Sequence, residues 1–127
     1  MLRVMMAAAV LCTAAIPAMA ADPAAGEKAF AVCKACHKVG EGAKNGVGPV
    51  LNGVVGRAAG SAEGYKYSDA MASSGITWDE ANLAEYLKNP KTKVAGNKMM
   101  FAGVKDDTKL ADIIAFLGQI NADGTKK

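Results

Sequence analysis

An unusually glycine-rich segment runs from residue 38 to residue 66, and it limits what this chain can fold into more than any other feature. It contains eight of the fourteen glycines, at positions 40, 42, 46, 48, 53, 56, 60 and 64. A loop of this length without secondary structure of its own is uncommon inside a small domain unless it has a function. We therefore expect the loop to have a function in the folded domain, such as enclosing a bound group.

Large apolar side chains are too few to fill the interior alone. Residues 21–127 contain 8 Val, 4 Ile, 5 Leu, 3 Met, 3 Phe, 3 Tyr and 1 Trp, which together are 27 of 107 residues. Small domains are already marginal because much of their surface stays exposed. A large planar cofactor beneath the loops would supply the missing core. At 127 residues the chain has room for one domain, and its composition excludes a coiled coil, a collagen-like chain and a disulfide-rich toxin.

Residues 1–20 have the pattern of a secretory signal peptide. Arg3 is the only charged residue before Asp22, and a continuous apolar run follows it. Ala18-Met19-Ala20 then supplies the small-x-small pattern of a cleavage site. We predict cleavage after Ala20 and export to the periplasm.

Two other interpretations of this segment are weaker. A membrane anchor would need a longer apolar run to span about 30 Å of hydrocarbon. A lipoprotein would carry a small residue before its acylated cysteine, whereas Leu11 precedes Cys12. Cleavage would leave a single domain of residues 21–127 with 14 basic and 12 acidic residues, a formal charge of +2, and two cysteines.

Helical patterns dominate this predicted domain, and no convincing strand pattern accompanies them. Asp22-Pro23 is a good helix start, because an N-cap side chain precedes proline at the first helical position. Small and apolar residues follow at helical spacing, at positions 26, 29, 30 and 33.

Two further helices are predicted in the second half of the chain. Thr77 and Glu80 have the spacing of a capping box, and the helix they begin is predicted to stop at Pro90. Asp106-Asp107 opens the last helix, whose apolar residues recur at positions 110, 113, 114 and 117. A short helical turn is expected within residues 69–74.

The sequence Cys33-Lys34-Ala35-Cys36-His37 carries the chemistry. The pattern C-x-x-C-H is the attachment motif of c-type haem. On a helical turn, residues i and i+3 lie on one face, so both cysteines can reach two vinyl groups of one porphyrin. The histidine would then lie beneath the iron.

Three other interpretations of this motif are possible, and two of them lack a component. A zinc site normally has four ligands, whereas residues 21–127 offer two cysteines and one histidine. A thioredoxin-like redox pair requires a βαβ context, which the sequence does not indicate. A plain disulfide beside an unrelated histidine is the simplest alternative.

The iron would need a sixth ligand or would remain open. The chain has a single histidine, so a bis-histidine haem is excluded. Residues 21–127 contain three methionines, Met71, Met99 and Met100, and the last two lie in a loop flanked by Gly96 and Gly103. A thioether opposite histidine favours Fe(II) and raises the reduction potential.

The order of these motifs resembles that of the class I c-type cytochromes, close to mitochondrial cytochrome c and the short bacterial cytochromes c2. The resemblance extends from Gly26 to about Leu117 and includes the haem-attachment motif, Gly48-Pro49 and the Met99 loop. It implies an all-α cytochrome c fold. In that fold, three main helices and short helical turns wrap around one covalently bound haem.

The resemblance also assigns roles on both faces of the haem. Cys33 and Cys36 would hold the haem covalently, and His37 and Met99 would be the axial iron ligands. The carbonyl of Pro49 would accept the Nδ1 proton of His37, which would orient the ring and increase its basicity.

Further residues are implied around the haem edge and its ligands. Arg57, Tyr67 and Trp78 match the groups that hydrogen-bond the haem propionates. Tyr86 matches the tyrosine whose hydroxyl approaches the methionine sulfur. Asn97 replaces the usual threonine of the methionine loop, and its amide is expected to donate to a propionate.

The function implied by the resemblance is electron transfer, and the protein is not expected to be an enzyme. Two filled axial positions leave no open iron for a substrate, and an open-iron haem enzyme or sensor is the alternative. We expect a soluble, monomeric periplasmic one-electron carrier that binds no nucleic acid and does not insert into the membrane after cleavage. The donor would be a bc1-type complex and the acceptor a terminal oxidase or a photosynthetic reaction centre. Four lysines would surround the exposed haem edge and guide docking: Lys28, Lys91, Lys98 and Lys105.

Overall fold

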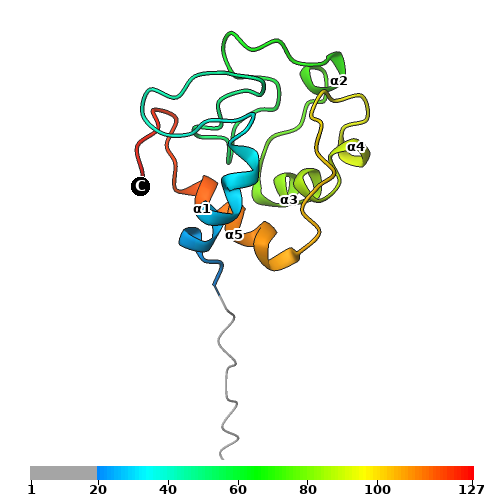
Figure 1. The fold of residues 1–127 in the computed structure, drawn as a ribbon. Helices are drawn as coiled ribbons and strands as arrows, with labels where there is room; N and C mark the ends of the chain where they lie inside the picture. Colours follow the sequence, from blue (N-terminus) through cyan, green and yellow to red (C-terminus); the bar gives the residue numbers. More distant parts are fainter. Residues whose placement is uncertain (1–19) are drawn as a thin grey trace, which may run out of the picture.

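The computed structural model describes residues 20–127, which form helices and loops (Figure 1). The elements, in order, are α1 (Pro23–Ala29), η1 (Phe30–Cys33), α2 (Asp69–Ala72), α3 (Glu80–Lys88), α4 (Pro90–Lys93) and α5 (Asp107–Gly118). Within residues 20–127, extended pairing is limited to two isolated β-bridges. The all-α prediction is therefore confirmed. The predicted signal peptide lies almost entirely outside the described residues.

The first and last helices cross at one end of the molecule (Figure 1). Gly26 of α1 lies so close to α5 that a Cβ there would collide with the carbonyl oxygen of Asp112. The Phe30 and Phe116 rings lie beside this crossing, with centroids 5.4 Å apart. The close approach of the two helices therefore requires glycine at position 26, and the aromatic pair packs beside it.

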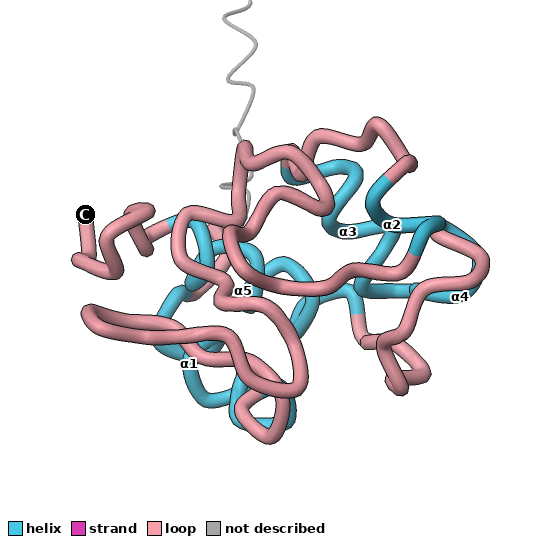
Figure 2. The backbone as a smooth tube through the Cα atoms, turned by 90° about the horizontal axis from the view of Figure 1, so that it is seen from above, coloured by secondary structure: helices cyan, strands magenta, loops and turns pink. Residues whose placement is uncertain are grey.

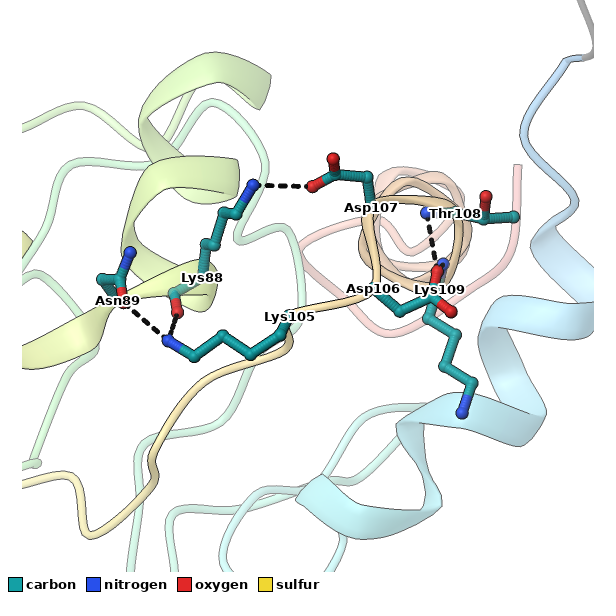
Figure 3. Close-up of polar contacts among 7 residues, drawn as sticks. All are labelled: Lys88, Asn89, Lys105, Asp106, Asp107, Thr108 and Lys109. Carbon is teal, nitrogen blue, oxygen red and sulfur yellow. Dashed lines mark hydrogen bonds and ion pairs between the residues drawn. The ribbon is translucent and has the colours of Figure 1, made fainter.

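Helix α5 begins at Asp106-Asp107 as predicted, and Asp106 is its N-cap. The carboxylate accepts hydrogen bonds from the backbone N–H groups of Thr108 and Lys109, at 2.9 and 3.1 Å (Figure 3). These bonds satisfy donors that have no partner inside the helix. The apolar face of α5 then supplies much of the buried core: Leu110, Ile113, Ile114, Phe116 and Leu117.

The start of α3 differs from the predicted capping box. Asp79, not Thr77, is the N-cap, and its carboxylate accepts from the backbone N–H of Asn82 at 2.7 Å. The N–H of Trp78 is bonded to the carbonyl of Arg57 at 2.8 Å. This pairing holds residues 77–78 extended, so helical geometry begins only after them.

The end of α3 agrees with the sequence pattern, because the helix stops at Lys88, just before Pro90. Pro90 does more than end a helix, since it is fully buried and begins the four-residue turn α4. Proline suits the first position of a helix, where its missing N–H would have had no partner. The turn α4 was not predicted.

The glycine-rich segment folds as a set of loops over the helices (Figure 2). Asn52 fastens it, because its amide donates to the Gly40 carbonyl and its oxygen accepts from the Gly40 N–H, both at 2.8 Å. Asn52 is buried, yet asparagine is so common in loops that no sequence pattern indicates this role. Among the described residues, no helix is long and apolar enough to cross a membrane.

Candidate cofactor site

The loops and helices enclose a cavity of about 430 Å³. The predicted ligands and their neighbours meet in its lining, although they come from distant parts of the chain: Cys33, Cys36, His37, Pro49, Tyr86 and Met99. The residues expected to bind the haem propionates line it too: Arg57, Tyr67 and Trp78. The side chains therefore form a shell around a central space, as the small number of large apolar residues suggested.

A single helical turn brings both cysteines and the histidine to this cavity. The backbone N–H groups of Cys36 and His37 donate to the carbonyl of Cys33, at 3.1 and 2.9 Å. Both thiols are free, so no disulfide joins them. Burial raises the pKa of the Cys33 thiol, and the neighbouring Cys36 adds to that shift. Two free thiols on one turn are suited to covalent attachment of one planar group.

His37 is held in a single orientation. Its Nδ1 lies 2.8 Å from the carbonyl oxygen of Pro49, which can only accept, so Nδ1 carries the proton. Gly48 lies against the ring, and a Cβ there would come within 2.5 Å of Cε1. Burial lowers the pKa of His37, while the bond to Pro49 opposes that shift. The ring is thus kept neutral, with the Nε2 lone pair free to bind a metal.

Arg57 provides an observation against which the expected cofactor can be tested. Its Nη1 donates to the carbonyls of Val50 and Asn52, at 3.0 and 3.1 Å. Its Nε is buried and has no hydrogen-bond partner within residues 20–127. Burial lowers the pKa of this guanidinium. A buried cationic donor of this kind requires an acceptor, and the carboxylate of a haem propionate would provide one.

The other residues predicted to bind the propionates, Tyr67 and Trp78, have different neighbours in the cavity lining. The hydroxyl oxygen of Tyr67 accepts from the backbone N–H of Ala62 at 2.9 Å, which leaves its own proton to donate. Trp78 is buried against Tyr86, with ring centroids 4.8 Å apart. Tyr65, which the sequence did not single out, also lines the cavity and donates to the Val47 carbonyl at 2.8 Å.

Helix α3 brings a hydroxyl to the predicted methionine ligand. The Oη of Tyr86 lies 3.9 Å from the Sδ of Met99. Burial raises the pKa of Tyr86 to about 12, and the charge on Tyr65 would add to that shift. The hydroxyl therefore keeps its proton and can donate to sulfur. Met100, the adjacent candidate, is 94 % exposed.

Asn97 behaves differently from the expectation that its amide would reach a propionate. Its Nδ2 donates to the carbonyls of Pro90 and Val94, at 3.0 and 2.8 Å. Its Oδ1 accepts from the backbone N–H of Met99 at 2.8 Å. Both amide protons already have acceptors inside the protein because α4, which was not predicted, places two carbonyls beside them. Asn97 still contacts Met99, so it remains next to the predicted ligand.

The four predicted docking lysines are all exposed, but two also bind the protein itself. The Nζ of Lys105 donates to the Lys88 carbonyl and to Oδ1 of Asn89, at 2.5 and 2.6 Å (Figure 3). The Nζ of Lys98 donates to the carbonyl of Lys66 at 3.2 Å. Lys105 thus fixes the end of α3, a structural role that the sequence did not indicate.

Comparisons with known proteins agree with this site. Residues 23–121 match the family model described as Cytochrome c. Cytochrome c2 from Blastochloris viridis is 55% identical over 118 residues, which cover 93% of each chain. Cytochrome c-554 from Methylosinus trichosporium is 56% identical over 115 residues, covering 91% of this chain and 87% of that one. The structure of cytochrome cH from Methylobacterium extorquens is 59% identical, has a TM-score of 0.72, and covers 76% of this chain and 96% of that one.

This chain therefore belongs to the cytochrome c family. It is a class I c-type cytochrome of the bacterial kind and has the cytochrome c fold. It binds haem c covalently, with Cys33 and Cys36 at the attachment positions. It is an electron-transfer protein rather than an enzyme.

Proposed function

We propose that this cytochrome is a one-electron carrier whose haem iron is ligated by His37 and Met99. The observation that carries the proposal is that both side chains line one cavity, each held by its own partner. The Pro49 carbonyl meets Nδ1 of His37 at 2.8 Å, and the Tyr86 hydroxyl meets the sulfur of Met99 at 3.9 Å. When bound, haem c supplies reversible one-electron chemistry between Fe(III) and Fe(II).

The residues around the two ligands would set the reduction potential in opposite directions. The bond from His37 to Pro49 makes the imidazole a stronger donor, which favours Fe(III). The thioether of Met99 favours Fe(II), and burial in an apolar cavity disfavours the extra charge of the oxidised form. Arg57 would hold a propionate through its free Nε–H and exclude water from that edge.

The choice between Met99 and Met100 tests this proposal. Met99→Ala should abolish the weak long-wavelength absorption band that marks methionine ligation, lower the reduction potential, and let added imidazole bind tightly. Met100→Ala should do none of these, because its side chain is 94 % exposed. Absorption spectroscopy and redox titration of the two variants make the measurement. If Met100→Ala lost the band instead, the ligand assignment would be wrong.

We further propose that the protein works in the periplasm after removal of residues 1–20. The charged start, apolar run and Ala18-Met19-Ala20 end support this. Amino-terminal sequencing of the protein from a periplasmic extract should give Ala21 as the first residue. A first residue of Met1 would contradict export by this route.

As partners we propose a bc1-type donor and either a terminal oxidase or a photosynthetic reaction centre as acceptor. The exposed lysines support a docking surface that favours acidic partners. Lys98 is the strongest candidate among them, since it immediately precedes Met99. Lys105 is weaker, because its ammonium group already has two acceptors within the protein.

A further inference from the structure

Residues 94–106, here called the methionine strap, are fastened to the segment from Leu87 to Val94 at both ends. At the far end, the backbone N–H of Val104 donates to the Leu87 carbonyl at 2.8 Å. The Nζ of Lys105 donates to the Lys88 carbonyl beside it (Figure 3). The strap therefore returns to α3 immediately after carrying Met99 past the cavity.

The near end is fastened by one side chain. All three hydrogen bonds of the Asn97 side chain go to backbone groups. Its nitrogen donates to the carbonyl of Pro90, in α4, and to that of Val94, the C-cap of α4. Its oxygen accepts from the N–H of Met99. The acceptor bond spans two residues, which is the pattern of an Asx turn. The amide nitrogen is thus bonded to α4 and its C-cap. The amide oxygen is bonded to the N–H of Met99 and so fixes the backbone just before that residue.

The residues around Asn97 offer few other constraints on this turn. Ala95 and Gly96 are exposed, and Gly96 has a φ of +87°. Between the buried Val94 and the half-buried Met99, only Asn97 is not exposed. The backbone bond from Asn97 N to the Val94 carbonyl is longer, at 3.2 Å. The Asn97 side chain is therefore the main contact that connects the position of α4 to that of Met99.

We propose that Asn97 is a positioning residue for Met99, which holds the strap closed against the cavity. The inference rests on the proposed function, in that Met99 is taken as an iron ligand. Loss of the Asn97 contacts should allow Met99 to leave more readily, so that an added ligand competes with it more successfully. The increase in the affinity of the added ligand should be larger than the loss of overall folding stability alone explains.

Imidazole titration of the ferric holoprotein, followed by absorption, measures this competition. Asn97→Ala removes all three contacts and should increase the apparent imidazole affinity by about tenfold or more, which corresponds to about 1.4 kcal/mol or more. Asn97→Asp keeps the acceptor for the Met99 N–H but loses both donors, and its affinity should lie between the wild type and Asn97→Ala. The long-wavelength band should persist in both variants without imidazole.

Asn52→Ala is the matched control. The Asn52 side chain also makes two 2.8 Å hydrogen bonds to backbone groups, but within the glycine-rich segment rather than beside Met99. This substitution should lower the free energy of unfolding without changing the imidazole affinity. Equal imidazole affinities for Asn97→Ala and Asn52→Ala, or a wild-type affinity for either Asn97 variant, would overturn the proposal. Met99→Ala separates the two claims: if it keeps the band, Met99 is not the ligand, whatever the Asn97 variants show.

Discussion

The two walls of the cavity are held in different ways. On the histidine wall, residues 33–51, the groups that hold the imidazole itself are backbone. The N–H of Gly48 donates to the Cys36 carbonyl at 2.8 Å, and the Pro49 carbonyl accepts from His37. Gly48 itself lies in contact with the imidazole ring. The groups that meet the His37 ring directly are therefore backbone, although side chains support the loop behind them: Oδ1 of Asn45 accepts from the Val50 N–H at 2.8 Å, and Arg57 donates to the Val50 carbonyl at 3.0 Å.

The methionine wall, residues 86–105, depends on side chains. Asn97 and Lys105 fasten the strap, and Tyr86 approaches the sulfur of Met99. Each of these contacts can be removed by one substitution without changing the backbone path. With His37 and Met99 as the proposed ligands, the comparison indicates that backbone groups hold the histidine, whereas side chains on the methionine side can adjust ligand strength.

The largest effect should come from removing the attachment on the histidine wall. Cys33→Ala/Cys36→Ala should leave the protein without haem and largely unfolded. An empty cavity of about 430 Å³ would cost about 10 kcal/mol, which is comparable with the whole stability of a small domain. Circular dichroism checks this, and a cooperatively folded apoprotein with normal helicity would contradict it.

A smaller but still large effect is expected at Gly48. In Gly48→Ala the new methyl group would lie within 2.5 Å of Cε1 of His37, so the ring or the loop must move. Overpacking of this kind typically costs about 1–3 kcal/mol. Guanidinium unfolding of the holoprotein gives the free energy. Gly118→Ala is the matched control, because a Cβ at Gly118 meets nothing within 4 Å, and it should change the stability little.

On the methionine wall a single removed group should have a modest effect. Tyr86→Phe deletes the hydroxyl that lies 3.9 Å from the Met99 sulfur and leaves the ring against Trp78. The unfolding free energy should fall by about 1 kcal/mol or less. The reduction potential should shift while the long-wavelength band remains. A loss as large as that of Gly48→Ala would show that the two walls do not differ in the way described.

The smallest effect on stability should come from the exposed charge on the strap. Lys98→Glu should slow electron transfer to a partner protein mainly through the association rate, and the difference should fade as salt rises. Lys127→Glu changes the net charge equally, but Lys127 ends the chain far from α4 (Figure 1). Stopped-flow kinetics at two ionic strengths compares them. Equal slowing by both substitutions would mean that total charge matters and position does not.

The sequence predicted the histidine wall better than the methionine wall, for a physical reason. The meeting of Cys33, Cys36 and His37 at the cavity follows from spacing within one helical turn, and the helix start at Asp106-Asp107 is equally local. The prediction for Thr77 is wrong because its backbone is held by pairing with Ala58, which lies far earlier in the sequence. The contacts of Asn97 depend on α4, a turn too short to show a periodic pattern. Lys105 looked like surface charge because its acceptors, at Lys88 and Asn89, are distant in the sequence.

The close crossing at Gly26 has a consequence for how the chain reaches its native state. The backbone N–H of Asp22 is bonded to the carboxylate of Asp112, ninety residues later, so the two ends of the domain must find each other across nearly its whole length. Closing a flexible loop of that size costs about 4 kcal/mol in chain entropy. Few contacts made earlier can offset this, because the intervening residues are mostly irregular. Although its secondary structure is all helical, the molecule therefore includes native contacts of high sequence separation, which slow folding compared with the local contacts of a helical bundle.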